Sequence, residues 1–73
     1  MTEIQMKVLG TFEADQLISQ DQIAAILKSH PTQVTGVLNS LMNLGYIDTP
    51  EGTLYMMTDR GQIAFNSEVE RDY

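Results

Sequence analysis

Apolar residues near the start of the chain recur at the spacing of a helical face. Between residues 2 and 15 they fall at intervals of four, one and three, which predicts a first helix with one apolar stripe. The stripe consists of Ile4, Val8, Leu9 and Phe12. The short apolar pair Leu17 and Ile18 that follows is expected to form a brief strand.

A second helix is predicted over about residues 20–28. Ser19 can cap its start, and Gln22, three residues later, can bond back to it in the pattern of a capping box. The apolar residues expected to be buried are Ile23, Ala24 and Leu27.

The third predicted helix covers residues 31–44. Pro31 disfavours the helical conformation at His30, so Pro31 is expected as the first residue of the helix, with His30 at its cap. Gly45 can adopt the left-handed conformation that ends a helix. The apolar stripe consists of Val34, Leu38, Leu41 and Leu44, with Val37 and Met42 beside it.

A β-hairpin is predicted next, because residues 46–48 and 53–57 are rich in β-formers and flank the turn sequence Thr49-Pro50-Glu51-Gly52. Alternation along the second strand puts Leu54 and Met56 on one face and Tyr55 and Met57 on the other. One of these pairs must therefore face outward or meet a partner.

The chain is expected to end in a helix and an acidic tail. Thr58 and Asp59 can cap a last helix that continues to about Val69. Residues 67–73 carry Glu68, Glu70 and Asp72 and are expected to fray, which leaves residues 1–66 as a single domain.

The order of these elements resembles the winged helix-turn-helix domain, and three segments carry the resemblance. Residues 18–27, ISQDQIAAIL, are similar to the strand and xxELAxxL helix of that family. Residues 32–47, TQVTGVLNSLMNLGYI, resemble its recognition helix and first wing strand. Residues 55–61, YMMTDRG, resemble the Y-x-L-T-x-x-G that ends the wing in MarR-type and related regulators. The resemblance implies an α+β, mostly α, fold with a three-helix core, a β-hairpin wing and a C-terminal helix.

In the DNA-binding members the third helix enters the major groove, so the resemblance implies a small transcriptional regulator. The base-reading residues would be Thr32, Gln33, Thr35 and Asn39, with Gly36 and Asn43 on the same face. The phosphate contacts would be Lys28, His30 and Arg60. Gln and Asn can pair with adenine, and Thr can touch a thymine methyl group. Gly36 costs about 1 kcal/mol against alanine inside a helix, which favours a surface that something approaches closely.

The charge of the chain favours an alternative. Ten acidic and four basic residues give a net charge of -6, the wrong sign for nucleic acid or an anionic membrane. Residues 31–47 include no Lys or Arg, and the predicted wing offers Asp48 and Glu51. DNA binding would therefore call for a homodimer, which doubles the phosphate contacts, for a larger complex, or for a basic partner. The alternative is an acidic module that docks a basic protein or imitates the charge of DNA, with contacts at Tyr55, Met57 and Glu51.

Several other functions are not expected. The chain has no cysteine, which excludes disulfides and thiolate metal sites, and the single histidine, His30, has no ligand set around it. No phosphate-binding glycine loop, G-x-S-x-G elbow or H-E-x-x-H helix occurs, so we expect neither enzymatic activity nor a cofactor. No signal peptide or apolar run of about 20 residues is present, which predicts a cytoplasmic protein without a membrane partner.

Overall fold

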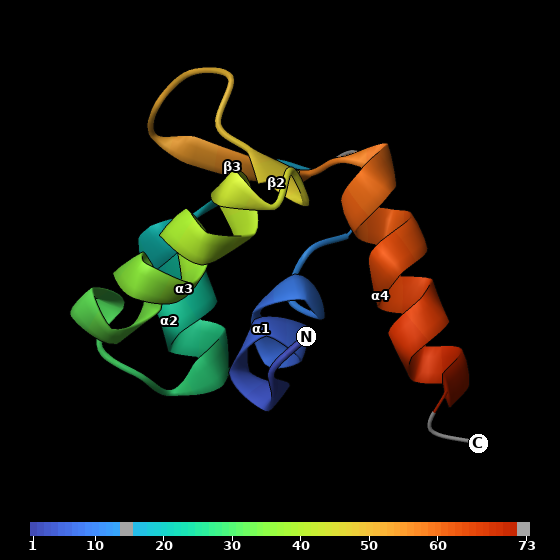
Figure 1. The fold of residues 1–73 in the computed structure, drawn as a ribbon. Helices are drawn as coiled ribbons and strands as arrows, with labels where there is room; N and C mark the ends of the chain where they lie inside the picture. The colour runs from blue at the N-terminus through green and yellow to red at the C-terminus, as the bar shows by residue number, and fades with distance from the viewer. Residues whose placement is uncertain (14–15, 72–73) are drawn as a thin grey trace.

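The computed structural model describes residues 1–13 and 16–71, the side chain of Arg71 excepted (Figure 1). The described residues form an α+β fold that is mostly helical. Its elements, in chain order, are α1 (Glu3–Leu9), β1 (Ile18–Ser19), α2 (Gln20–Leu27), α3 (Pro31–Asn43), β2 (Ile47–Asp48), β3 (Leu54–Met57) and α4 (Asp59–Arg71). No helix within the described part of the chain combines the length and the apolar character that a bilayer span needs.

Helices α1, α2 and α3 pack around one hydrophobic core. The buried side chains are Val8, Leu9, Phe12, Ile23, Ala24, Val34, Leu38, Leu41 and Ile47. The predicted capping box of α2 is confirmed, since the Ser19 hydroxyl accepts from the Gln22 backbone N–H at 3.1 Å and Gln22 Oε1 accepts from the Ser19 N–H at 2.9 Å. The helix ends at Leu27, and its C-cap Lys28 has a left-handed φ of 55°.

The predicted end of the first helix was wrong. The first helix stops at Leu9 rather than near residue 15, because Thr11 and Phe12 donate backbone hydrogen bonds to Val8 and Leu9 in a tight turn. This turn still buries Phe12, whereas Ile4 is 45% exposed. Asp15, the predicted last residue of that helix, lies outside the described residues.

The apolar stripe predicted for the third helix is one residue too long. Helix α3 ends at Asn43, and Leu44, its C-cap, is 42% exposed. The chain turns at Gly45, whose φ of 79° is the predicted left-handed stop. Leu44 therefore points out of the core while Val34, Leu38 and Leu41 are buried as expected.

The three strands form an antiparallel sheet with β3 in the centre. The predicted hairpin is confirmed by the pairing of β2 with β3, in which Ile47 faces Met57. On its other side β3 pairs with β1, and Ile18 lies opposite Tyr55. The sheet therefore ties the start of α2 to the hairpin.

Helix α4 is held against the hairpin at its first turn. The Thr58 hydroxyl accepts from the Gly61 N–H at 3.0 Å and donates to the Gly45 carbonyl at 2.6 Å. Gly61 is buried, and a Cβ there would collide with the Tyr46 carbonyl oxygen. The Thr58-to-Gly61 motif thus allows a close approach between α4 and the end of α3.

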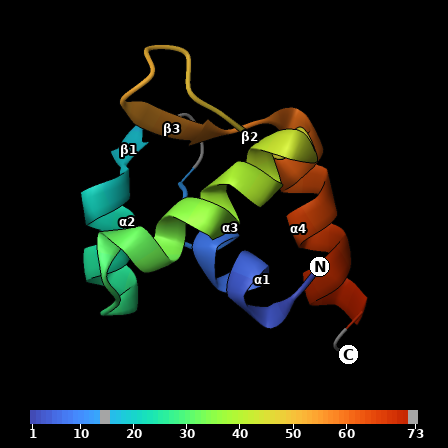
Figure 2. The ribbon, with the colours of Figure 1, turned by 60° about the vertical axis from the view of Figure 1, so that its left-hand side comes forward.

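The last helix is slightly longer than predicted, because α4 continues to Arg71 rather than to about Val69. The fraying expected for residues 67–73 stays a prediction. Figure 2 shows α4 on the side of α1 that is away from α2. Phe65 packs against the core, and Glu68 accepts from the Met1 amino group at 3.2 Å. These contacts hold the last turns of the helix, while residues 72 and 73 lie outside the described part of the chain.

Candidate functional site

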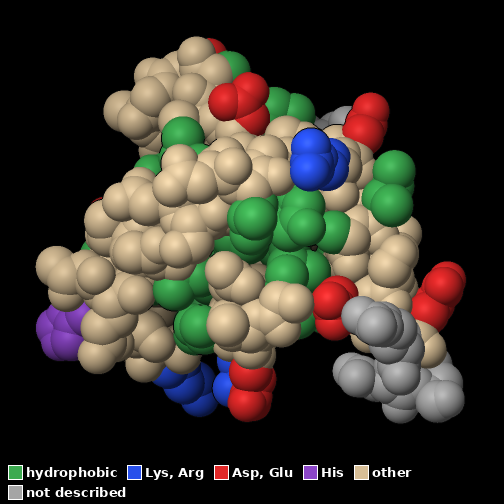
Figure 3. All heavy atoms as spheres, in the orientation of Figure 1, with side chains coloured by type: hydrophobic (Ala, Val, Ile, Leu, Met, Phe, Trp, Pro, Cys, Tyr) green, Lys and Arg blue, Asp and Glu red, His purple; other side chains and the backbone are tan. Residues whose placement is uncertain are grey.

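One edge of α3 is exposed along the whole helix. It consists of Thr32, Gln33, Thr35, Gly36, Asn39, Ser40 and Asn43. The buried residues Val34, Leu38 and Leu41 lie on the opposite face, so the orientation predicted for this helix is confirmed. Figure 3 shows the surface over α3 as a continuous uncharged area. We call these seven residues the α3 edge.

Two of the four predicted base-reading side chains are engaged within the protein. Gln33 Oε1 accepts from the His30 backbone N–H at 3.2 Å, which satisfies one of the free donors at the start of α3. The Thr35 hydroxyl donates to the Pro31 carbonyl at 3.2 Å, one turn earlier in the helix. Both side chains are exposed, and the Gln33 Oε1 and the Thr35 hydroxyl already have partners within the protein.

Gln20 is a residue of this site that the sequence pattern did not identify. Its Nε2 donates to both the Pro31 carbonyl and the Thr35 hydroxyl, and so links the first turn of α2 to the first turn of α3. The partners lie 11 and 15 residues away, and no local pattern in the sequence signals such a contact. These two bonds connect the start of the α3 edge to the end of α2 that follows β1.

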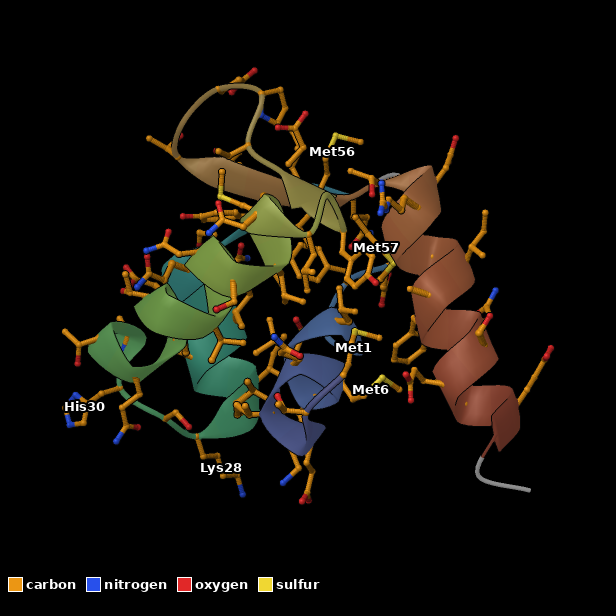
Figure 4. All side chains as sticks on the ribbon, in the orientation of Figure 1. Met1, Met6, Lys28, His30, Met56 and Met57 are labelled. Atoms are coloured by element: carbon orange, nitrogen blue, oxygen red, sulfur yellow. The ribbon has the colours of Figure 1, made fainter. Side chains whose placement is uncertain are left out.

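The three predicted phosphate contacts lie at the two ends of α3 rather than in one cluster. Lys28 and His30 are exposed in the turn before the helix, and Figure 4 shows both at that end of the molecule. Arg60 is exposed on the first turn of α4, where its Cδ lies 3.6 Å from the position of a Cβ on Gly45. A helix of 13 residues is roughly 20 Å long, so Lys28 and Arg60 flank the whole α3 edge.

The hairpin presents a different apolar pair from the one predicted for protein contact. Tyr55 and Met57 are half-buried and pack against the core, which leaves Leu54 and Met56 on the other face of β3. In Figure 4 Met57 lies between the hairpin and the helices, and Met56 points away from them. Glu51, the third predicted contact, is exposed in the turn. The outward-facing pair is therefore Leu54 and Met56, because core packing requires Tyr55 and Met57.

Acidic side chains lie on the hairpin and not on α3. Asp48 and Glu51 are both exposed, and Asp48 Oδ1 accepts from the Thr49 backbone N–H at 2.8 Å. The side chains along this surface are therefore uncharged over the α3 edge and negatively charged over the hairpin.

A separate open hollow of about 390 Å³ lies between the start of α2 and the segment that follows α1. Its lining residues are Thr11, Glu13, Gln16, Leu17, Ile18, Gln22, Ala25 and Ile26. The hollow contains none of the predicted site residues. Within the described ranges, no group of three or more His, Cys, Asp or Glu side chains is arranged to hold a metal ion.

The comparisons with known proteins add no relative to this description. No family model matches the chain, and neither the curated proteins nor the solved structures include a significant match to it. A function for the α3 edge must therefore be argued from its own geometry and chemistry.

Proposed function

We propose that this protein is a winged-helix DNA-binding protein, a small transcriptional regulator that places α3 in the major groove of duplex DNA. The observation that supports this most directly is the α3 edge, a free helical surface whose side chains are all uncharged and either small or polar. The major groove is about 12 Å wide and admits one α-helix. A surface of this kind fits base edges better than it fits a hydrophobic partner.

The element order supports the same proposal. A strand joined to the first of two helices, a tight turn between those helices, and a hairpin after them is the arrangement of a winged helix-turn-helix. In this interpretation the hairpin of β2 and β3 is the wing. The hydrogen bond from Gln20 to α3 would keep the two helices at a constant angle while α3 lies in the groove.

The positions of the cations suit a backbone contact on each side of the groove. Lys28 and His30 precede α3 and Arg60 lies beyond its end, so with α3 in the groove these side chains would lie toward the phosphates on either side of it. The two cations, Lys28 and Arg60, neutralise two phosphates per copy, which corresponds to a salt slope of about -1.8 and to weak binding for a monomer. We therefore propose that a two-fold dimer binds, with two copies of α3 about one DNA turn apart.

The test is retention of a randomised duplex pool by the purified protein at about 50 mM salt, where phosphate contacts are strongest. We expect retention that decreases as salt is raised. The control is the double variant Lys28→Ala with Arg60→Ala, which removes two exposed cations without touching the core. A pool that passes through unretained at this salt concentration would refute DNA binding.

The acidic hairpin favours a second candidate function, the docking of a basic protein. Asp48 and Glu51 are exposed beside the half-exposed pair Leu54 and Met56, so this surface joins negative charge to apolar area. A basic partner with an apolar contact would complement both. Binding of such a partner that is lost in Asp48→Asn with Glu51→Gln, together with no retention of DNA, would favour this candidate over the first.

A further inference from the structure

The hydrogen bonds along the α3 edge divide its side chains into two groups. Gln33, Thr35 and Ser40 already have partners within the protein, since the Ser40 hydroxyl donates to the Gly36 carbonyl at 3.0 Å and the other two are bonded as described above. Among the described residues, no hydrogen bond involves the side chains of Thr32, Asn39 or Asn43, and all three are exposed. These three retain their full capacity to bind an external group.

The free side chains are aligned along the helix. Thr32, Gly36, Asn39 and Asn43 follow one another at intervals of four, three and four residues, which places them in one row on an α-helix. The row lies opposite the buried Leu38 and Leu41. It is therefore the part of α3 that would reach furthest into a groove.

Gly36 lies in the middle of this row and gives it clearance. A Cβ built on Gly36 would have no heavy atom within 4 Å, so neither packing nor backbone conformation requires a glycine there. An asparagine side chain is short, and its amide reaches a base edge only if the helix backbone comes close. A residue without a side chain at the centre of the row permits that approach.

The chemistry of the row selects among base pairs. Guanine is read mainly by Arg or Lys and cytosine by Asp or Glu, and residues 31–47 contain none of these four types. Asparagine pairs bidentately with adenine N6 and N7, and the threonine methyl group contacts the methyl group of thymine. The asparagine amide therefore matches adenine, and the threonine methyl group matches thymine, the two bases of an A·T pair.

We infer that Asn39 and Asn43 are the specificity-determining residues of the proposed DNA-binding function, and that they select A·T base pairs in the major groove, with Thr32 as a thymine contact. This inference rests on the proposed function. It assigns base selectivity to the two asparagines, whose amides have no partner among the described residues, ahead of Gln33 and Thr35, because the Gln33 Oε1 and the Thr35 hydroxyl already bond within the start of α3.

The experiment is selection from a randomised duplex pool at about 50 mM salt, followed by sequencing of the retained DNA. We expect enrichment of A·T pairs at fixed positions with the original protein. Asn39→Ala and Asn43→Ala should each lower this enrichment about tenfold at one position, the effect of a lost bidentate contact. The matched control is Ser40→Ala, a change on the same edge that removes only an internal hydrogen bond and should leave the selected sequence unchanged.

The outcomes separate this inference from the proposed function. Retention without enrichment, enrichment of G·C pairs, or A·T enrichment that survives both asparagine substitutions would overturn the inference and leave DNA binding in place. A failure to retain any duplex would overturn both. Circular dichroism of each variant shows whether a loss of selectivity comes from unfolding. We expect both variants to stay folded, because both asparagines are exposed.

Discussion

Two helices contain an internal glycine, and the fold requires a glycine at only one of the two positions. Gly61 is buried on the first turn of α4, where a Cβ would collide with the Tyr46 carbonyl oxygen. Gly36 is exposed in the middle of α3 and has free space around the position of its missing Cβ. The first glycine is required by the fold, and the second lowers helix stability with no gain in packing.

Alanine at these two positions should therefore change stability in opposite directions. We expect Gly61→Ala to lower the free energy of unfolding by about 3 kcal/mol, because α4 must move away from the hairpin. Gly36→Ala should raise it by about 1 kcal/mol, the difference in helix propensity. Urea unfolding monitored by circular dichroism measures both. A destabilising Gly36→Ala would show that its surroundings in solution are not open.

At the scale of the elements, helix starts were predictable and some helix ends were not. The starts of α2 and α3 are specified by Ser19, Gln22 and Pro31, which act on backbone groups within three or four residues. The early end of α1 comes from the tight turn at Thr11 and Phe12, which the apolar spacing did not signal, and the continuation of α4 to Arg71 comes with contacts to other elements. Phe65 against the core is one such contact, and no local pattern distinguished it from a fraying helix.

The capping box of α2 offers a quantitative check at this scale. Ser19→Ala removes the hydroxyl that accepts from Gln22 and should lower the free energy of unfolding by about 1 kcal/mol. Ser40→Ala is the matched control, since its exposed hydroxyl bonds only within α3, and we expect a change within about 0.5 kcal/mol. Equal losses for the two serines in thermal unfolding would argue against a stabilising cap.

At the scale of the whole molecule, the distribution of charge matters more than its sum. The net charge is -6, yet the α3 edge is uncharged and exposed cations lie beyond each of its ends. Acidic side chains are on the hairpin and on α4, so a duplex that meets α3 would have the hairpin as its nearest negative surface. Repulsion there would limit the affinity of a single copy.

The salt dependence of binding should report how many copies take part. A monomer whose Lys28 and Arg60 contact phosphates would give a slope of about -1.8 in log affinity against log salt, and a dimer about -3.6. We expect the steeper value. Lys28→Ala should reduce the dimer slope by about 1.8, one contact from each copy. Fluorescence anisotropy between 50 and 200 mM salt measures it, and an unchanged slope in Lys28→Ala would exclude Lys28 as a phosphate contact.

The amino-acid sequence by itself determined the order of the elements, the hairpin turn, the stop at Gly45 and the face of α3 that is buried. These features arise from backbone conformation and from side chains a few residues apart, so a local pattern contains them. Only the tertiary structure decided that Tyr55 and Met57 face the core and that Gln20 bonds to Pro31 and Thr35 of α3. Both features depend on elements far apart in the chain, so no local pattern of residues contains them.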